Sequence, residues 1–338
     1  MTYSIFCFSD AGASLALKLC EMLRVDKLNV HSTPKYAGKY GFTEHETISS
    51  ATGDLFRESD ALIFIGAAGI AVRSIAPHVV SKVSDPAVLV IDDRGRFVIS
   101  LLSGHIGGAN GLARSIAGLI GAEPVITSAT DGAGKFSCDA WAVTHDCAIS
   151  SMAAAKDVSA AILTGDIPVT SEYPLPEELP SGLRRAEEGE LGIYIGIHKN
   201  DPFDTTLRLI PRTVTLGIGC RKDIPLESVM AAVRSVLDEA NIDLRSVGRI
   251  ASIVNKKDEK GLLETARVIG AETVFFTADE LNAVPGEFEE SEFVRKTVGT
   301  GNVCERAAVL AGGELIIKKT AVNGVTVAAS VQERRIEF

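Results

Sequence analysis

The stretch Phe97-Val98-Ile99-Ser100-Leu101-Leu102-Ser103-Gly104-His105-Ile106-Gly107-Gly108-Ala109-Asn110 joins a run of β-forming residues to a helical pattern over 111–120. Three glycines around one histidine predict a backbone that approaches something closely, because glycine has no Cβ atom. Amide groups at the start of such a helix favour an anionic ligand group or a developing oxyanion. The alternative is a plain strand-to-helix turn with Ser103 or Asn110 as its cap.

The residues around this stretch alternate between strand and helix patterns, which is typical of an α/β domain. Residues 87–91 and 96–100 flank Asp92-Asp93-Arg94-Gly95 and predict a β-hairpin that leads into the opening stretch. The other expected strands and the first helix cover 3–8, 28–31, 61–65, 124–127 and 13–23. The apolar run at 61–65 is expected of a strand buried on both faces of a parallel sheet.

A second glycine turn, Gly66-Ala67-Ala68-Gly69, follows the strand at 61–65 and precedes a predicted helix at 70–75. Open α/β sheets bind ligands at such turns, at the carboxyl edge of the sheet. The turn lacks the third glycine and the acidic residue of a dinucleotide fingerprint, so a nucleotide cofactor is not favoured. Asp131 follows the strand at 124–127 as His105 follows its own strand, and the two polar side chains can converge on one crevice.

The pattern changes at Phe136 and again at Pro211-Arg212. The sequence therefore predicts two α/β domains, 1–135 and 212–338, joined by a small α/β middle module at 136–211. The middle module carries one helical pattern, two strands and a polar loop over 172–190. The final domain has glycine or lysine loops at strand ends, and Asn323-Gly324 is a strong hairpin signal. Those strand-end loops cover 217–221, 255–261 and 299–305.

Composition excludes several classes of protein. The chain has 338 residues, of which 46% are hydrophobic, as expected of two or three folded domains. Its formal charge of −10 disfavours a nucleic-acid partner. The first residues form a strand pattern rather than a signal peptide, and no apolar run is long enough for a membrane span, so we expect a cytosolic protein. The six cysteines are scattered without a C-x-x-C pair, which argues against zinc and disulfides.

Three candidates for chemistry each have a structural alternative. Ser103 and His105 could pair across a glycine, although a lone loop histidine is more often a surface residue. Cys220 lies beside Arg221, which would lower the thiol pKa, although cysteine is more often a small buried residue. Glu305 stands three residues after Asn302, as in a helix-capping arrangement, and structure is the stronger interpretation for it.

The chain resembles the CbiG family of anaerobic cobalamin biosynthesis. In the first domain the resemblance rests on Gly66 to Arg73, Leu101 to Asn110 and Pro124 to Asp131. In the final domain it rests on Gly217 to Arg221, Lys257 to Leu262 and Val303 to Ala308. The segments follow the family's order and cover nearly the whole chain, and the Ser-Gly-His-x-Gly-Gly-Ala-Asn block is the most specific.

The resemblance implies a hydrolase that opens the δ-lactone of cobalt-precorrin-5A and releases the methylated meso carbon as acetaldehyde, giving cobalt-precorrin-5B. A binding module that holds a corrinoid intermediate without chemistry is the alternative, and a nucleotide-using enzyme is a third hypothesis. The tetrapyrrole substrate brings its own cobalt, so no cofactor and no metal site are expected. The family leaves open a homodimer and transient contact with methyltransferases of the pathway, with neither nucleic acid nor membrane as a partner.

The resemblance also implies roles for particular residues. A base near neutral pKa must activate water, and amides must stabilise the oxyanion; Gly107 and Gly108 are the expected donors. The expected catalytic residues are His105, Ser103, Asp131 and Glu305. The expected substrate-binding residues, with basic groups for the carboxylates of the substrate, are Gly66, Gly69, Arg73, Gly104, Gly107, Gly108, Asn110, Gly219, Cys220, Arg221 and Lys257.

Overall fold

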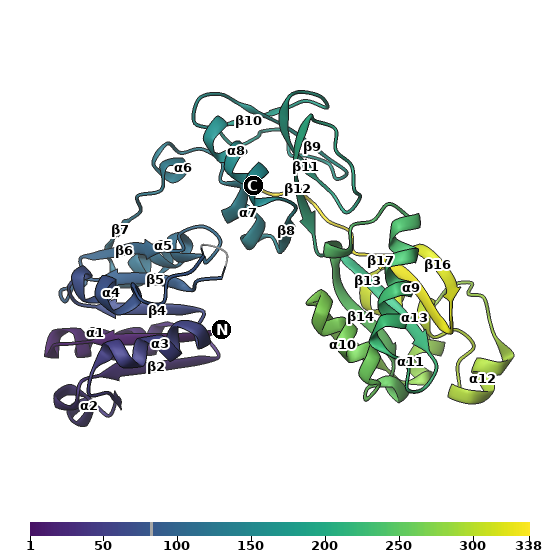
Figure 1. Cartoon of the computed structure of the whole chain (residues 1–338), viewed down its shortest axis with the longest axis horizontal. Coiled ribbons are helices and arrows are strands. Elements are labelled where there is room, and N and C mark those ends of the chain that lie inside the picture. The colour runs from purple at the N-terminus through teal and green to yellow at the C-terminus, as the bar shows by residue number, and fades with distance from the viewer. Residues whose placement is uncertain (82–83) are drawn as a thin grey trace. The chain divides into compact units, whose positions relative to one another are not determined.

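The protein is described by a computed structural model over residues 1–81 and 84–338, with the side chains of Thr130 and Asp131 outside the described part. The chain folds into two compact units, Met1–Val143 and Thr144–Phe338. Three sheets, all flanked by helices, confirm the predicted α/β class (Figure 1). The first unit includes residues 136–143, which the sequence assigned to the middle module. In the described part of the chain, no helix is long and apolar enough to cross a membrane.

The first unit is built on a seven-stranded sheet of order β3-β2-β1-β4-β5-β6-β7. Its strands are β1 (Thr2–Cys7), β2 (Lys27–Ser32), β3 (Thr43–Glu44), β4 (Ala61–Ile65), β5 (Ala87–Ile91), β6 (Phe97–Leu102) and β7 (Glu123–Val125). Its helices are α1 (Asp10–Met22), α2 (Pro34–Tyr40), α3 (Ile48–Glu58), α4 (Ala68–Ile75), α5 (Ala109–Ile120), α6 (Ala129–Gly132) and α7 (Cys138–Thr144).

Helices cover both faces of this sheet, as the apolar run of β4 predicts. Every residue of β4 is buried, and its side chains alternate between two apolar clusters. Ile63 and Ile65 pack with α1 and α5, while Leu62 and Phe64 pack with α3 and α4. Gly121 ends α5 in the left-handed conformation, with φ of 71°, which glycine adopts readily at the end of a helix.

The direction of the strands reverses between β5 and β6. Strands β1 to β5 run parallel, whereas β6 is antiparallel to β5 and β7 is parallel to β6. Leu102 at the end of β6 therefore pairs with Val88 at the beginning of β5. Gly66, which follows β4, instead donates to the carbonyl of Ile91 at the end of β5. The Ser103–Asn110 loop and the Gly66–Gly69 turn consequently lie at opposite edges of the sheet.

The second unit contains two five-stranded sheets. The middle sheet has the order β10-β9-β11-β12-β8, with α8 packed on it. Its elements are β8 (Cys147–Ile149), α8 (Met152–Ala161), β9 (Ile167–Ser171), β10 (Leu183–Arg185), β11 (Leu191–Ile195) and β12 (Thr205–Pro211). Helix α8 and strands β9 and β11 agree with the one helix and two strands predicted for the middle module. Strands β8, β10 and β12 were not predicted, and β10 lies inside the segment predicted to be a loop.

The last sheet has the order β15-β14-β13-β17-β16. Helices α9 and α10 cover one face, and α11 and α13 cover the other. The strands are β13 (Val214–Cys220), β14 (Val247–Ile253), β15 (Glu272–Phe276), β16 (Glu314–Val322) and β17 (Val325–Val331). The helices are α9 (Leu226–Glu239), α10 (Lys260–Ile269), α11 (Ala278–Asn282), α12 (Glu292–Val298) and α13 (Cys304–Gly312), with 3-10 turns η1 (Leu244–Ser246) and η2 (Val254–Lys256). Asn323 and Gly324 both have positive φ and close the predicted hairpin.

One close approach positions the start of α13. A Cβ atom on Gly217 of β13 would lie 1.8 Å from the carbonyl oxygen of Cys304. Only glycine allows this packing, because a methyl group there would overlap the backbone of the helix. Gly217 thus places the first turn of α13 beside the carboxyl end of β13.

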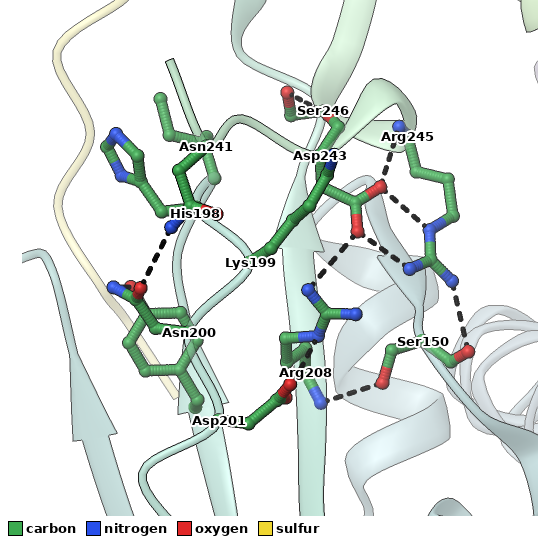
Figure 2. A network of polar contacts seen from close by, with 12 residues as sticks. Ser150, His198, Lys199, Asn200, Asp201, Arg208, Asn241, Asp243, Arg245 and Ser246 are labelled. Atoms are coloured by element: carbon green, nitrogen blue, oxygen red, sulfur yellow. Dashed lines mark hydrogen bonds and ion pairs between the residues drawn. The ribbon is translucent and has the colours of Figure 1, made fainter. Parts of the chain in front are cut away.

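A polar network joins the middle sheet to the last domain (Figure 2). The Asp243 carboxylate, 5% exposed, lies 2.7 Å from Nη2 of Arg245 and 3.5 Å from Nη1 of Arg208 on β12. Arg245 also donates to the Ser150 carbonyl, and the Ser150 hydroxyl accepts from the Arg208 amide. Near the other end of the chain, Arg334 donates to the carbonyl of His145. Polar contacts therefore join the middle sheet to the last domain in two places.

Candidate functional site

The Ser103–Asn110 loop is wound tightly after β6. Ser103 has a φ of 56°, a conformation that costs a residue other than glycine about 1 kcal/mol or more. A Cβ atom on Gly107 would lie 2.4 Å from the Cβ of Ser103, so this position requires glycine. The amides of Gly108, Ala109 and Asn110 donate to carbonyls within the same loop. The Gly107 amide has no partner among the described residues.

His105 forms a pair with Asp139 of α7. The imidazole Nδ1 lies 3.1 Å from Oδ1 and 3.2 Å from Oδ2 of this carboxylate. The Ser137 hydroxyl donates to Oδ1 over 2.8 Å, and the Asp139 side chain is 10% exposed. Burial raises the pKa of Asp139, but the hydrogen bond and charge of His105 and the bond from Ser137 outweigh it, and the net pKa lies below 3.8. Asp139 is therefore a carboxylate at neutral pH.

This geometry selects one form of the imidazole. A carboxylate at Nδ1 favours a proton on that nitrogen and leaves the lone pair on Nε2. It also stabilises the imidazolium that forms when Nε2 takes up a proton. The His105 side chain is 20% exposed, which permits contact with a ligand. The pair has the form of a general base with a positioning carboxylate.

A cavity of about 550 Å³ opens on the same edge of the sheet. Ile106 and Gly107 line it together with residues near the amino ends of β4 and β5, among them Asp60 and Pro86. His78 contributes a further polar group to its wall. The amide of Gly107 thus belongs to a loop that borders a space large enough for a ligand group.

A second cavity, of about 870 Å³, lies in the last domain. Its walls come from the carboxyl ends of β13 and β14, the starts of α10 and α13, and helix α12. All three predicted loops, 217–221, 255–261 and 299–305, contribute residues to this cavity. This is the carboxyl edge at which open α/β sheets bind ligands.

Two segments of the chain match known family descriptions. Residues 50–131 match the family description "Cobalamin synthesis G N-terminal", and residues 214–330 match "Cobalamin synthesis G C-terminus". A protein of Salmonella typhimurium named cobalt-precorrin-5A hydrolase is 35% identical over 349 residues, which cover 97% of this chain and 97% of that protein. The chain belongs to the CbiG family.

Other CbiG relatives show the same extent of similarity. A cobalt-precorrin-5A hydrolase of Priestia megaterium is 33% identical, over 96% of this chain and 94% of that protein. Among solved structures, a cobalamin biosynthesis protein G homolog from Sulfolobus solfataricus is 23% identical, with a TM-score of 0.40, and covers 98% of this chain and 97% of its own. The two family descriptions and the two relatives named cobalt-precorrin-5A hydrolase confirm the resemblance of the sequence to the CbiG family.

Within this CbiG chain, the structure separates residues that the sequence analysis grouped together. The expected pair of Ser103 and His105 does not form, because the Ser103 hydroxyl is buried without a hydrogen-bond partner among the described residues and the imidazole faces Asp139 instead. Gly66, Gly69 and Arg73 lie at the opposite edge of the sheet, where the Arg73 guanidinium donates to the Gly69 carbonyl. Asp131 belongs to α6, but its side chain lies outside the described residues.

The loop residues Gly104, Gly108 and Asn110 have structural contacts. A Cβ atom on Gly104 would lie 2.6 Å from Oδ1 of Asn110, so the loop packs directly on this side chain. Asn110 is 4% exposed and donates to the Ser128 hydroxyl over 3.0 Å. The amide of Gly108 donates to the His105 carbonyl, so it is not the expected free oxyanion donor.

In the last domain, the expected activation of Cys220 is wrong, and Lys257 lies away from the cavity. The Cys220 pKa is raised by burial, against the lowering effect of Lys256, so the thiol is not activated and Arg221 does not lower its pKa. Lys257 is exposed and does not line the cavity, whereas its neighbour Lys256 does and pairs with Glu259 over 3.0 Å. The 3-10 turn η2 places these adjacent lysines in different directions.

Glu305 lies in a buried helix-capping arrangement at the start of α13. It is 3% exposed, and both of its carboxylate oxygens accept hydrogen bonds, one from the Asn302 amide group and one from the Lys319 backbone amide. Asn302 in turn accepts from the Glu305 amide over 3.0 Å. This reciprocal arrangement confirms the capping interpretation, and Glu305 does not border the cavity.

Asp139 is the residue that the sequence analysis missed. It lies 34 positions from His105 and was assigned to the middle module, where the segment Ser137-Cys138-Asp139 carried no recognised motif. The remaining signal was an acidic residue in the first turn of a short helix, which is also common in structural caps.

Among the described residues, no group of three or more His, Cys, Asp or Glu side chains could hold a metal ion.

Proposed function

We propose that this chain hydrolyses the δ-lactone of cobalt-precorrin-5A and releases acetaldehyde, leaving cobalt-precorrin-5B. The observation that carries the proposal is the 35% identity, over 97% of both chains, to a protein named for this activity. The His105–Asp139 pair supplies a base for the chemistry. The cobalt ion belongs to the substrate, and the proposed steps use only side chains and backbone groups of this chain.

In the first step, Nε2 of His105 removes a proton from water as the water oxygen attacks the lactone carbonyl. Asp139 stabilises the imidazolium and holds the ring in the required tautomer. The amide of Gly107 is the candidate donor to the tetrahedral oxyanion. Collapse of the intermediate breaks the bond between carbonyl carbon and ring oxygen, and the imidazolium returns its proton to the departing alkoxide.

In the second step, neutral His105 removes the proton of the new alcohol. The carbon–carbon bond to the macrocycle breaks, its electron pair flows into the conjugated ring, and the two-carbon fragment leaves as acetaldehyde. The macrocycle or its solvent then takes up the proton. One base therefore serves both steps, and no second acidic side chain is required.

Incubation of the purified protein with cobalt-precorrin-5A, with acetaldehyde measured against a control without enzyme, tests the proposal. We expect aldehyde with the wild-type chain and none above the control with His105→Ala. Absence of aldehyde with the wild-type chain would refute the activity. Substrate binding with no turnover would instead indicate a protein that holds the corrinoid intermediate.

A further inference from the structure

The cavity of the last domain has an unusual charge for this protein. Five basic side chains line it, against three acidic ones, although the whole chain carries a formal charge of −10. The basic residues are Arg221, Lys222, Lys256, Lys260 and Lys319. A concentration of positive charge against the overall field is expected where a ligand is itself acidic.

Four of these cations have no acidic partner within ion-pair distance among the described residues. Lys256 is paired with Glu259, but Arg221, Lys222, Lys260 and Lys319 are not paired. Several arginines elsewhere in the same unit are paired with carboxylates, namely Arg208, Arg245, Arg249, Arg295 and Arg306. The cavity therefore gathers four unpaired cations on one side of the last sheet.

Lys260 is also unfavourably placed for the stability of its helix. It is the first residue of α10, whose amino terminus carries a partial positive charge. A cation at this end costs the helix a fraction of a kcal/mol, whereas an anion is stabilised by both the lysine and the helix. A residue that is unfavourable for local structure, such as a cation at a helix amino terminus, is expected at a functional site.

One wall of the cavity is apolar and comes from α12. Phe293 is 78% exposed, an unusual state for a phenylalanine, and Val294 and Val298 lie on the same helix. Ile253 at the end of β14 adds further apolar surface. An exposed aromatic ring beside a positive cavity suits a ligand that has a flat apolar face and an acidic rim.

We propose that this cavity binds the substrate tetrapyrrole, with Phe293 against the face of the macrocycle and Arg221, Lys222, Lys260 and Lys319 paired with its peripheral carboxylates. The inference rests on the proposed function, which supplies a planar polycarboxylate as ligand. The volume of about 870 Å³ is near the upper end of the range for small-molecule sites, roughly 300–1,000 Å³. The last domain would thus recognise the carboxylates of the substrate.

Binding of stable corrins to the full-length chain tests the inference. Cobyrinic acid has free peripheral carboxylates, whereas cobinamide has the same ring with these groups amidated. We expect cobyrinic acid to bind at least about tenfold more tightly in calorimetric titration, with an affinity that falls as salt is added. Equal affinity for the two corrins would overturn carboxylate recognition.

Variants locate the site. We expect Lys260→Glu to raise the Kd for cobyrinic acid about tenfold or more, and Phe293→Ala about fivefold, because the ring loses its contact with the face of the macrocycle. Both side chains are exposed, so both variants should fold. Lys156→Glu on α8 makes the same charge change on an exposed residue away from the cavity and is the matched control. Equal Kd values for Lys260→Glu and the control, with no effect of Phe293→Ala, would overturn the assignment of the cavity.

His105→Ala separates the two proposals. We expect this variant to bind cobyrinic acid with unchanged Kd and to release no acetaldehyde. Failure of the wild-type chain to release aldehyde, together with binding that depends on Lys260 and Phe293, would refute the activity and retain the binding site. Loss of binding in His105→Ala would overturn the separation of recognition from chemistry.

Discussion

Replacement of Asp139 by asparagine should remove most of the activity and leave the fold intact. The imidazole of His105 lies 3.1 Å from this carboxylate, and both side chains are largely buried. At an effective dielectric constant of about 20, two unit charges at this distance attract by roughly 5 kcal/mol. If half or more of this stabilises the transition state, its loss lowers kcat by about a hundredfold to several thousandfold. KM should change little, because Asp139 acts on the imidazolium rather than on bound substrate.

Acetaldehyde release as a function of pH is the assay. Without the adjacent negative charge the imidazole is easier to deprotonate, so the ascending limb of the pH–rate profile should move to lower pH in Asp139→Asn. A purely structural role for Asp139 would not move this limb. Asp157→Asn, an exposed change on α8, is the matched control. A loss of less than about tenfold in an Asp139→Asn protein with unchanged Tm would refute the role of the pair.

Three other predictions concern stability and the cavity. Burial and the neighbouring His45 lower the pKa of His31 to about 4, so the folded state favours the neutral ring. The contribution of His31 to the free energy of unfolding is therefore complete above pH 6.5 and declines by up to about 3 kcal/mol as the pH falls to 4. In His31→Phe that decline should be absent from unfolding curves followed by Trp141 fluorescence, and an unchanged slope would contradict it. Because the Cys220 thiol is not activated, Cys220→Ser should keep kcat within about threefold of wild type; a loss above a hundredfold would show a nucleophile. Gly217→Ala should destabilise the second unit by about 3 kcal/mol or more in urea unfolding, since its methyl group overlaps the backbone of α13, and a change below 1 kcal/mol would mean that the helix shifts freely.

The direction of β6, and with it the position of the His105 loop, could have been predicted from the sequence. The hairpin over 87–100 was expected from its turn residues, and it is present. A hairpin reverses the chain, so it already implied that the His105 loop leaves the sheet at the edge opposite the Gly66 turn. The expectation that both glycine loops bind substrate did not take this reversal of the chain into account.

Other features depend on tertiary contacts that local patterns do not contain. Asp139 meets His105 across 34 positions, through the docking of α7 on the first unit. The pKa of Cys220 is governed by burial, which the adjacent arginine in the sequence could not show. The missed strands β8 and β10 have only three residues each, too few for a period-two pattern to be recognised.

The contact between Arg334 and the His145 carbonyl brings the beginning and end of the second unit together, and Figure 1 shows the yellow segment after β17 returning to the middle sheet. A module whose ends meet can be joined to another domain at a single place, or have its ends linked and new ones opened elsewhere. The second unit can therefore be transferred to another protein as one domain, with its cavity and its two sheets kept together.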